Sequence, residues 1–163
     1  MSTILAPPTG VLAHEQPRLD CPPKQATANS TLECLIVSPD THRRESLSRA
    51  AVDNGWTTVV CGDADSARHR AGRIALKLAI VDLERPSTAE SAKLRKFTAE
   101  LAQAGGPLLV VCGPEGDAKQ EIWARQLGVW LYLPGVAVAE AMAILSEQAR
   151  FLIEKANSES CAL

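Results

Sequence analysis

Ionisable and nucleophilic side chains follow several short apolar runs of this sequence, at the points where those runs end. Asp82 is the last residue but one of the run LKLAIVDL, Cys112 closes PLLVVC, and Ser-Pro-Asp at positions 38–40 follows LECLIV. A thiol at the end of a strand and near the amino end of a helix can have a lowered pKa and act as a nucleophile, with His42 as the candidate base on a neighbouring loop. Cysteine in an apolar strand is more often a small buried residue, so a Cys112 enzyme is the alternative hypothesis.

Other kinds of site lack the residues that they require. The five cysteines are widely spaced and contain no C-x-x-C pair, and His14 and His69 stand in different segments, so we predict no metal site and no disulfide framework. The glycines after Cys61 and Cys112 lack the spacing of a phosphate-binding loop, and each loop carries an acidic residue. We therefore expect no cofactor.

Composition also excludes several classes of partner. The chain of 163 residues is 46% hydrophobic and 22% charged, which suits one medium domain. A net charge of -2 gives no overall attraction to nucleic acid or anionic lipid. Because no apolar run reaches the roughly 18 residues of a membrane span, and residues 1–13 lack a basic start, we predict a cytoplasmic protein without membrane contact.

Five apolar runs rich in Val, Ile and Leu alternate with segments of helical period. The predicted strands are Leu32–Val37, Trp56–Cys61, Leu76–Leu83, Pro107–Cys112 and Gly128–Leu133. The predicted helices are Asp40–Asn54, about Asp63–Ala75, Ser87–Gly105, Asp117–Leu127 and Ala137–Asn157. This alternation predicts a doubly wound α/β domain with a parallel sheet, whose functional loops lie at the carboxyl ends of the strands.

Helix-capping residues and apolar stripes support these boundaries. Ser87 followed by Glu90 has the pattern of a capping box. Two apolar stripes are expected to face the sheet: Leu94, Phe97 and Leu101 in the third helix, and Ile122, Trp123 and Leu127 in the fourth. The proline-rich residues 1–30 are predicted to be a flexible leader, residues 31–157 the domain, and residues 158–163 a tail.

The segment LAIVDLERP, with Asp82 at the end of its strand, resembles the third strand and phospho-acceptor loop of response-regulator receiver domains. Ser38 and Asp82 are 44 residues apart, Asp82 and Cys112 are 30 apart, and Cys112 and Pro134 are 22 apart. These intervals are similar to the family's separations between acidic pair, phospho-acceptor, switch hydroxyl and lysine. The stretch IVSPDTHRRESL similarly resembles its first strand and helix, so the likeness covers residues 32–155. It implies a flavodoxin-like five-stranded sheet in the order 2-1-3-4-5 with five helices, and Asp82 as the candidate phospho-acceptor.

The sequence departs from the receiver pattern at the residues that handle the phosphoryl group. Ser38 and Pro39 stand where the family has its Mg²⁺-binding acidic pair, and Asp40 is expected to cap a helix instead. Cys112 stands at the switch hydroxyl, and no lysine occurs between residues 119 and 155. Magnesium is therefore expected only if Asp82 is phosphorylated, and efficient phosphorylation is not expected.

The last helix offers a partner surface. Its residues Val138, Met142, Leu145, Ala149, Leu152 and Ala156 follow heptad spacing. We assign Met142, Leu145 and Leu152 of this helix to a partner or dimer surface. Tyr132, the candidate fifth-strand aromatic, is assigned to the same surface. A longer packing helix explains the same spacing equally well.

These features lead to one interpretation and two alternatives. We predict a stand-alone, degenerate receiver-like signalling module of the two-component or phosphorelay type, which is not an enzyme. It would act through protein contacts with a histidine kinase or another signalling protein, or as a homodimer through its last helix. The alternatives are a working single-domain phospho-acceptor that uses Asp82 and a small flavodoxin-fold enzyme that uses Cys112.

Overall fold

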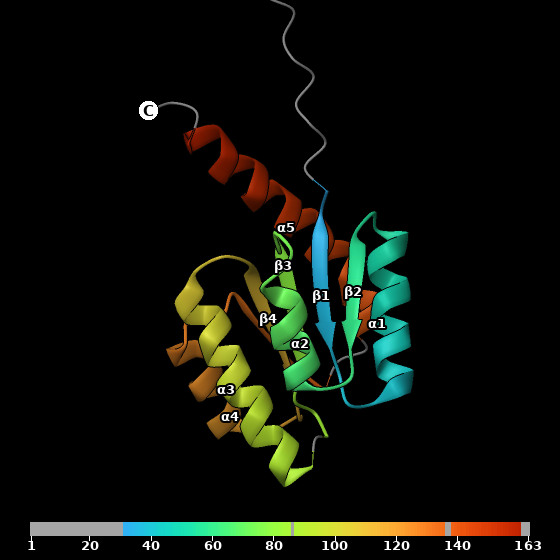
Figure 1. The fold of residues 1–163 in the computed structure, drawn as a ribbon, viewed down its shortest axis with the longest axis vertical. Helices are drawn as coiled ribbons and strands as arrows, with labels where there is room; N and C mark the ends of the chain where they lie inside the picture. The colour runs from blue at the N-terminus through green and yellow to red at the C-terminus, as the bar shows by residue number, and fades with distance from the viewer. Residues whose placement is uncertain (1–30, 86, 136–137, 161–163) are drawn as a thin grey trace, which may run out of the picture. The chain divides into compact units, whose positions relative to one another are not determined.

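The computed structural model describes residues 31–85, 87–135 and 138–160. Five strands form its sheet: β1 (Glu33–Val37), β2 (Thr57–Cys61), β3 (Leu78–Asp82), β4 (Leu108–Gly113) and β5 (Leu131–Pro134). Five helices connect and follow them: α1 (Thr41–Asp53), α2 (Ala64–Ala71), α3 (Thr88–Ala104), α4 (Ala118–Gln126) and α5 (Val138–Ser160). The strands are parallel in the order β2-β1-β3-β4-β5, so the predicted fold class is confirmed (Figure 1).

Four of the helices begin at the residues that the sequence indicates. Asp40, Asp63, Ser87 and Asp117 each accept the backbone N–H three residues ahead, which satisfies one of the free donors of the first turn. The side chain of Glu90 does not return to its own cap. It accepts the backbone N–H of Ala64 at 3.1 Å, and so links the start of α3 to the start of α2.

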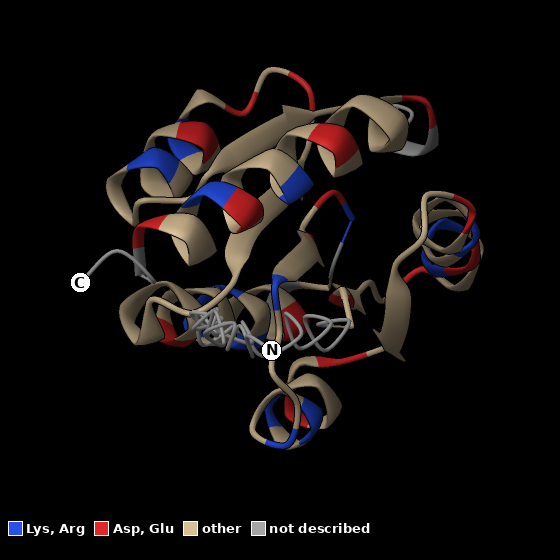
Figure 2. Ribbon diagram, turned by 90° about the horizontal axis from the view of Figure 1, so that it is seen from above, with Lys and Arg blue, Asp and Glu red and all other residues tan. Residues whose placement is uncertain are grey.

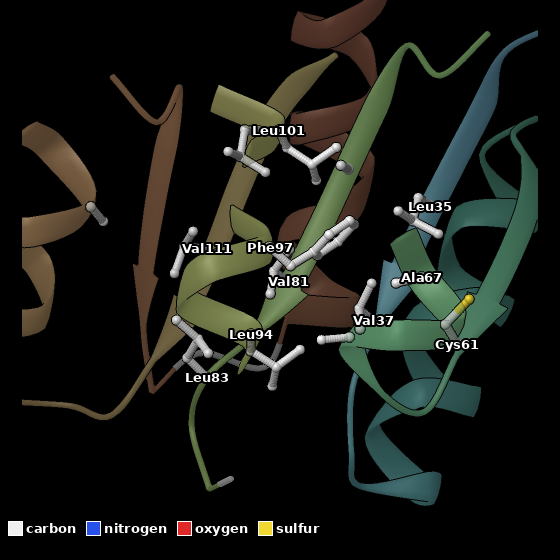
Figure 3. Close-up of a cluster of buried hydrophobic side chains, with 14 residues drawn as sticks. Leu35, Val37, Cys61, Ala67, Val81, Leu83, Leu94, Phe97, Leu101 and Val111 are labelled. Carbon is white, nitrogen blue, oxygen red and sulfur yellow. The ribbon is translucent and has the colours of Figure 1, made fainter. Parts of the chain in front are cut away.

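Two apolar clusters lie on the two faces of the sheet. One cluster packs Leu94, Phe97 and Leu101 of α3, with residues of α2 and α4, on the strands, as Figure 3 shows. The other packs α1 and α5 on the opposite face. Strand β3 is buried at all five positions. Because helices cover both faces of the sheet, this strand reads in the sequence as a nearly continuous apolar run.

The ends of α2 and α5 and the apolar stripe of α4 differ from the predictions, and β3 and β5 begin two and three residues later than predicted. Helix α2 ends at Ala71, immediately before the helix-weakening Gly72. Helix α5 continues to Ser160, so the first three residues of the predicted tail are helical, whereas residues 161–163 and the leader 1–30 lie outside the described residues. Ile122 is 55% exposed, because α4 turns Gln120 and Ala124 toward the core instead.

None of the described helices is both long enough and apolar enough to span a bilayer.

The carboxyl end of β4 is packed closely by neighbouring side chains. The hydroxyl of Tyr132 and the side-chain amide of Gln120 both lie where a Cβ atom on Gly113 would stand. A larger residue at this position would force both side chains to move. Gly106, by contrast, has no heavy atom within 4 Å of the corresponding position.

We predict that Gly113→Ala lowers the free energy of unfolding by about 1–3 kcal/mol, because overpacking displaces Tyr132 and Gln120. Urea denaturation followed by circular dichroism measures this change. Gly106→Ala is the matched control and should change stability by less than about 0.5 kcal/mol. Equal effects of the two substitutions would contradict the packing argument.

Candidate functional site

The candidate site lies at the carboxyl edge of the three central strands. Asp82 is the last residue of β3 and is 2% exposed. Its register partner on β4 is Cys112, and Ser38 directly follows β1 on the other side. The parallel sheet thus gathers three residues that are 30 or more positions apart, as their spacing predicts.

Both carboxylate oxygens of Asp82 accept hydrogen bonds. Oδ2 accepts the hydroxyl of Ser38 at 2.7 Å and Nε of Arg43 at 2.8 Å. Oδ1 accepts the backbone N–H of Glu84 at 3.1 Å and Nη2 of Arg43 at 3.4 Å. A buried carboxylate needs partners of this kind to offset its lost hydration.

Arg43 supplies the positive charge of the site. It lies in the first turn of α1, where its backbone N–H is held by the cap Asp40, and its guanidinium pairs with Glu84 as well as Asp82. Burial lowers the pKa of Arg43, but the hydrogen bond to Asp82 and the charges of Asp82 and Glu84 outweigh burial, so its pKa lies above the ordinary value. Arg43 therefore ties the loop after β3 to the start of α1.

Sequence reasoning did not assign Arg43 or Glu84 to the site. The signal that could have found Arg43 is its place three residues after the cap Asp40, within the stretch that resembles the first receiver helix. A long basic side chain in the first turn of that helix can reach the end of β3.

Ser38, Pro39 and Asp40, the residues predicted to stand at the acidic-pair positions, have different roles. Ser38 is fully buried and donates to Asp82, and its carbonyl accepts Nη1 of Arg44 at 2.7 Å. Asp40 is exposed and caps α1, as expected, and the backbone N–H of Arg43 lowers the pKa of its carboxyl group. Pro39 contributes no side-chain oxygen.

These residues do not suit the Mg²⁺ ion that a receiver domain uses. Mg²⁺ prefers several oxygen ligands in octahedral geometry, usually carboxylates and phosphate. Here Asp82 faces a serine hydroxyl and a guanidinium. In the described part of the chain, no group of three or more His, Cys, Asp or Glu side chains could hold a metal ion.

Cys112 is not placed for nucleophilic catalysis. Its side chain is 1% exposed, and burial, together with the negative charge of Asp82, raises its pKa to about 12. His42 lies on the exposed side of α1 and lines a groove with Glu45 and Arg49. Among the described residues, no hydrogen bond joins His42 to Cys112, so the Cys-His pair of the enzyme hypothesis is absent there.

The fifth strand brings no cation to Asp82. Leu133 pairs with Cys112 and Pro134 with Gly113, and neither side chain is charged. Tyr132 packs partly buried against the cluster under α2, α3 and α4, with its hydroxyl over Gly113. Burial raises the pKa of that hydroxyl.

Helix α5 places the predicted partner residues on different faces. Met142 and Leu145 are 0% and 3% exposed and belong to the cluster under α1 and α5. They hold the helix on the sheet and are not available to a partner, because the heptad spacing marks the core face here. Leu152, one heptad after Leu145, is 37% exposed, because it lies at the edge of this packing face and nearer the end of the helix.

Charged residues of both signs lie on the described helices. Figure 2 shows Lys and Arg interspersed with Asp and Glu on the helices around the sheet. Arg68 of α2, for example, pairs with Asp65 and with Glu100 of α3.

Solved structures of known proteins share this fold. A CheY-like response regulator receiver domain protein from Methanospirillum hungatei has a TM-score of 0.65 at 14% identity, with 77% of this chain and 99% of that chain covered. The receiver domain of an HD domain-containing protein from Pseudomonas fluorescens also has a TM-score of 0.65, at 17% identity, with 77% and 98% covered.

A third similar structure is a putative pilus assembly-related protein from Burkholderia pseudomallei, with a TM-score of 0.58 at 20% identity and coverage of 74% and 90%. The chain matches no protein-family model and no curated protein sequence. At these identities the likeness establishes the fold: the described domain has the receiver-domain architecture.

The pair of Arg43 and Asp82 generates a stability prediction. Arg43→Ala leaves a buried carboxylate with one charged partner fewer, so we expect the free energy of unfolding to fall by about 1–3 kcal/mol. Arg125→Ala, which removes an exposed pair with Glu121 on α4, should cost only a few tenths of a kcal/mol. Urea denaturation of both variants provides the comparison, and a neutral Arg43 variant would contradict the assigned role.

Alkylation by iodoacetamide tests the state of Cys112. With a pKa of about 12, only about one Cys112 thiol in ten thousand is ionised at pH 8, and the thiol is also buried. We expect Cys112 to be modified no faster than Cys34, whose pKa burial also raises to about 12. Peptide mass spectrometry of native and urea-unfolded protein measures both rates, and rapid native labelling of Cys112 alone would revive the enzyme hypothesis.

Proposed function

We propose that this chain is a degenerate receiver-like signalling module that acts through protein contacts and has no efficient Mg²⁺-dependent phosphorylation. The observation that carries the proposal is the contact between Arg43 and Asp82. A guanidinium occupies the carboxylate to which a receiver's metal and phosphoryl group would bind.

Electrostatics supports this proposal. A divalent cation placed about 5 Å from the guanidinium would be repelled by about 7 kcal/mol at an effective dielectric constant of about 20. The guanidinium of Arg43 pairs with two carboxylates, those of Asp82 and Glu84. Ser38 and Pro39 add no further carboxylate that could hold a cation there. Metal binding would therefore require Arg43 to leave.

The nucleophile itself is also engaged. A phosphoryl acceptor needs a free carboxylate oxygen in line with the leaving group. Oδ2 of Asp82 accepts two short hydrogen bonds, and Oδ1 accepts one from the backbone and one longer bond from Arg43. Donors of this kind lower the reactivity of both oxygens and must be broken before attack.

Protein contacts are the remaining route for a signal. The receiver architecture suggests a partner such as a histidine kinase or another signalling protein, and one comparison structure is the receiver domain of an HD domain-containing protein. Because Arg43 satisfies Asp82 internally, the module would present one conformation to its partner whether or not a kinase acts on it.

Thermal stability with and without Mg²⁺ plus beryllofluoride tests the proposal, because a ligand that binds the native state raises the melting temperature. We expect no rise for the wild-type protein. A rise that disappears in Asp82→Asn would identify a working phospho-acceptor and overturn the proposal.

A gain-of-function variant sharpens this test. The triple variant combines Ser38→Asp, Pro39→Asp and Arg43→Ala. It places two carboxylates after β1 and removes the competing cation. We expect this triple variant to gain a melting-temperature rise that requires Mg²⁺, provided that circular dichroism shows a folded domain. The variant Ser38→Asp, Pro39→Asp with Arg43 retained is the matched control, and an equal rise in it would show that Arg43 is not the obstacle.

A further inference from the structure

The outward face of α5 carries large apolar side chains that the domain does not cover. Ile144 is 64% exposed, Phe151 66% and Leu152 37%. Ile144 and Phe151 lie on the side of the helix opposite to Met142 and Ala149, which pack on the sheet, and Leu152 lies one heptad after Leu145 at the edge of that packing face. Isolated apolar side chains on a surface are ordinary, but these three are adjacent on one helix.

Grooves lie on both sides of Phe151. One is lined by Trp130, Ile144, Gln148 and Leu152, with a volume of about 500 Å³. The other lies toward α1 and is lined by Asn54, Ser146 and Arg150. Ser146 is 2% exposed, and its hydroxyl has no hydrogen-bond partner there. Phe151 and Glu147 line both grooves and form the ridge between them.

The helix also extends past the core that supports it. Ile153 is the last residue of α5 that packs on the cluster under α1 and α5, and residues 154–159 are all exposed. Figure 1 shows the carboxyl half of α5 projecting beyond the sheet. A helical end of this length gains little stability by itself, so a contact on this face would stabilise it.

Shape and charge point to a second copy of the same chain as the occupant. A two-fold interface requires a projection and a recess on one surface, and Phe151 stands directly beside the groove of Trp130 and Ile144. Glu147 and Lys155 each lie four residues from Phe151, one helical turn to either side. In an antiparallel pair that crosses at Phe151, Glu147 of each helix therefore meets Lys155 of the other.

We propose that the outward face of α5 binds the same face of a second copy of this chain, with the two helices antiparallel and crossing at Phe151. The contact would cover Ile144, Phe151 and Leu152 and form two equivalent ion pairs. It is centred on Phe151, on the opposite side of α5 from the buried heptad residue Met142. It does not depend on the chemistry of Asp82, so the phosphorylation test and this proposal can fail separately.

Charge exchange tests the proposed register. Sedimentation equilibrium of the full chain should give a dimer for the wild type. Glu147→Lys alone and Lys155→Glu alone each create two like-charge pairs, and each should raise the dissociation constant about tenfold, which equals about 1.4 kcal/mol. The double variant restores both pairs and should return to within about threefold of the wild type. In a parallel pair the double variant would offer no such rescue, and that result would overturn the antiparallel arrangement.

Apolar substitutions test the surface itself. Phe151→Ser should abolish the dimer and leave the melting temperature of the monomer unchanged, because this side chain is exposed in the single chain. Ile122→Ser is the matched control, since Ile122 is similarly exposed on α4, and it should leave the dimer intact. The proposal is overturned by a wild type that stays monomeric at the highest attainable concentration. It is equally overturned if Ile122→Ser, and not Phe151→Ser, dissociates the dimer.

Discussion

The ion pair between Asp82 and Arg43 determines the arrangement of the whole carboxyl edge of the sheet. A buried carboxylate at the end of a central strand is costly unless donors surround it. Ser38 and the backbone of Glu84 supply donors from two loops, and Arg43 supplies one from the first turn of α1. This requirement agrees with three features of the edge: Ser38 turns inward, Arg43 extends from α1 to the end of β3, and Glu84 pairs with the guanidinium.

The same pair joins two segments that are distant in the sequence. Ser38 follows β1 and Glu84 follows β3, and Arg43 at the start of α1 contacts both Asp82 and Glu84. A side chain of the protein thus supplies the positive charge between these two loops. Ser38 contributes its hydroxyl to the cluster, and Asp40 contributes the cap of α1.

The fold could be predicted from the sequence because its signals are local. Apolar runs mark the strands, and Asp40, Asp63, Ser87 and Asp117 mark the helix starts. Asp82, Ser38 and Cys112 could be grouped because parallel strands end at a common edge. Arg43 could not, because a long side chain on a helix can point to solvent or to the sheet, and spacing does not distinguish the two. The heptad pattern of α5 similarly identified a packing face without showing what it packs against, and it missed Phe151.

Helix α2 depends on a residue that the chain supplies much later. The carboxylate that accepts the backbone N–H of Ala64 belongs to Glu90, 26 positions further on and in α3. With eight residues, α2 is too short to be stable by itself, and it ends beside Gly72. Its first turn therefore completes its hydrogen bonds only after α3 has docked on the sheet. This dependence sets an order of assembly: α2 consolidates late in folding, and it should be among the first elements to open when α3 loosens.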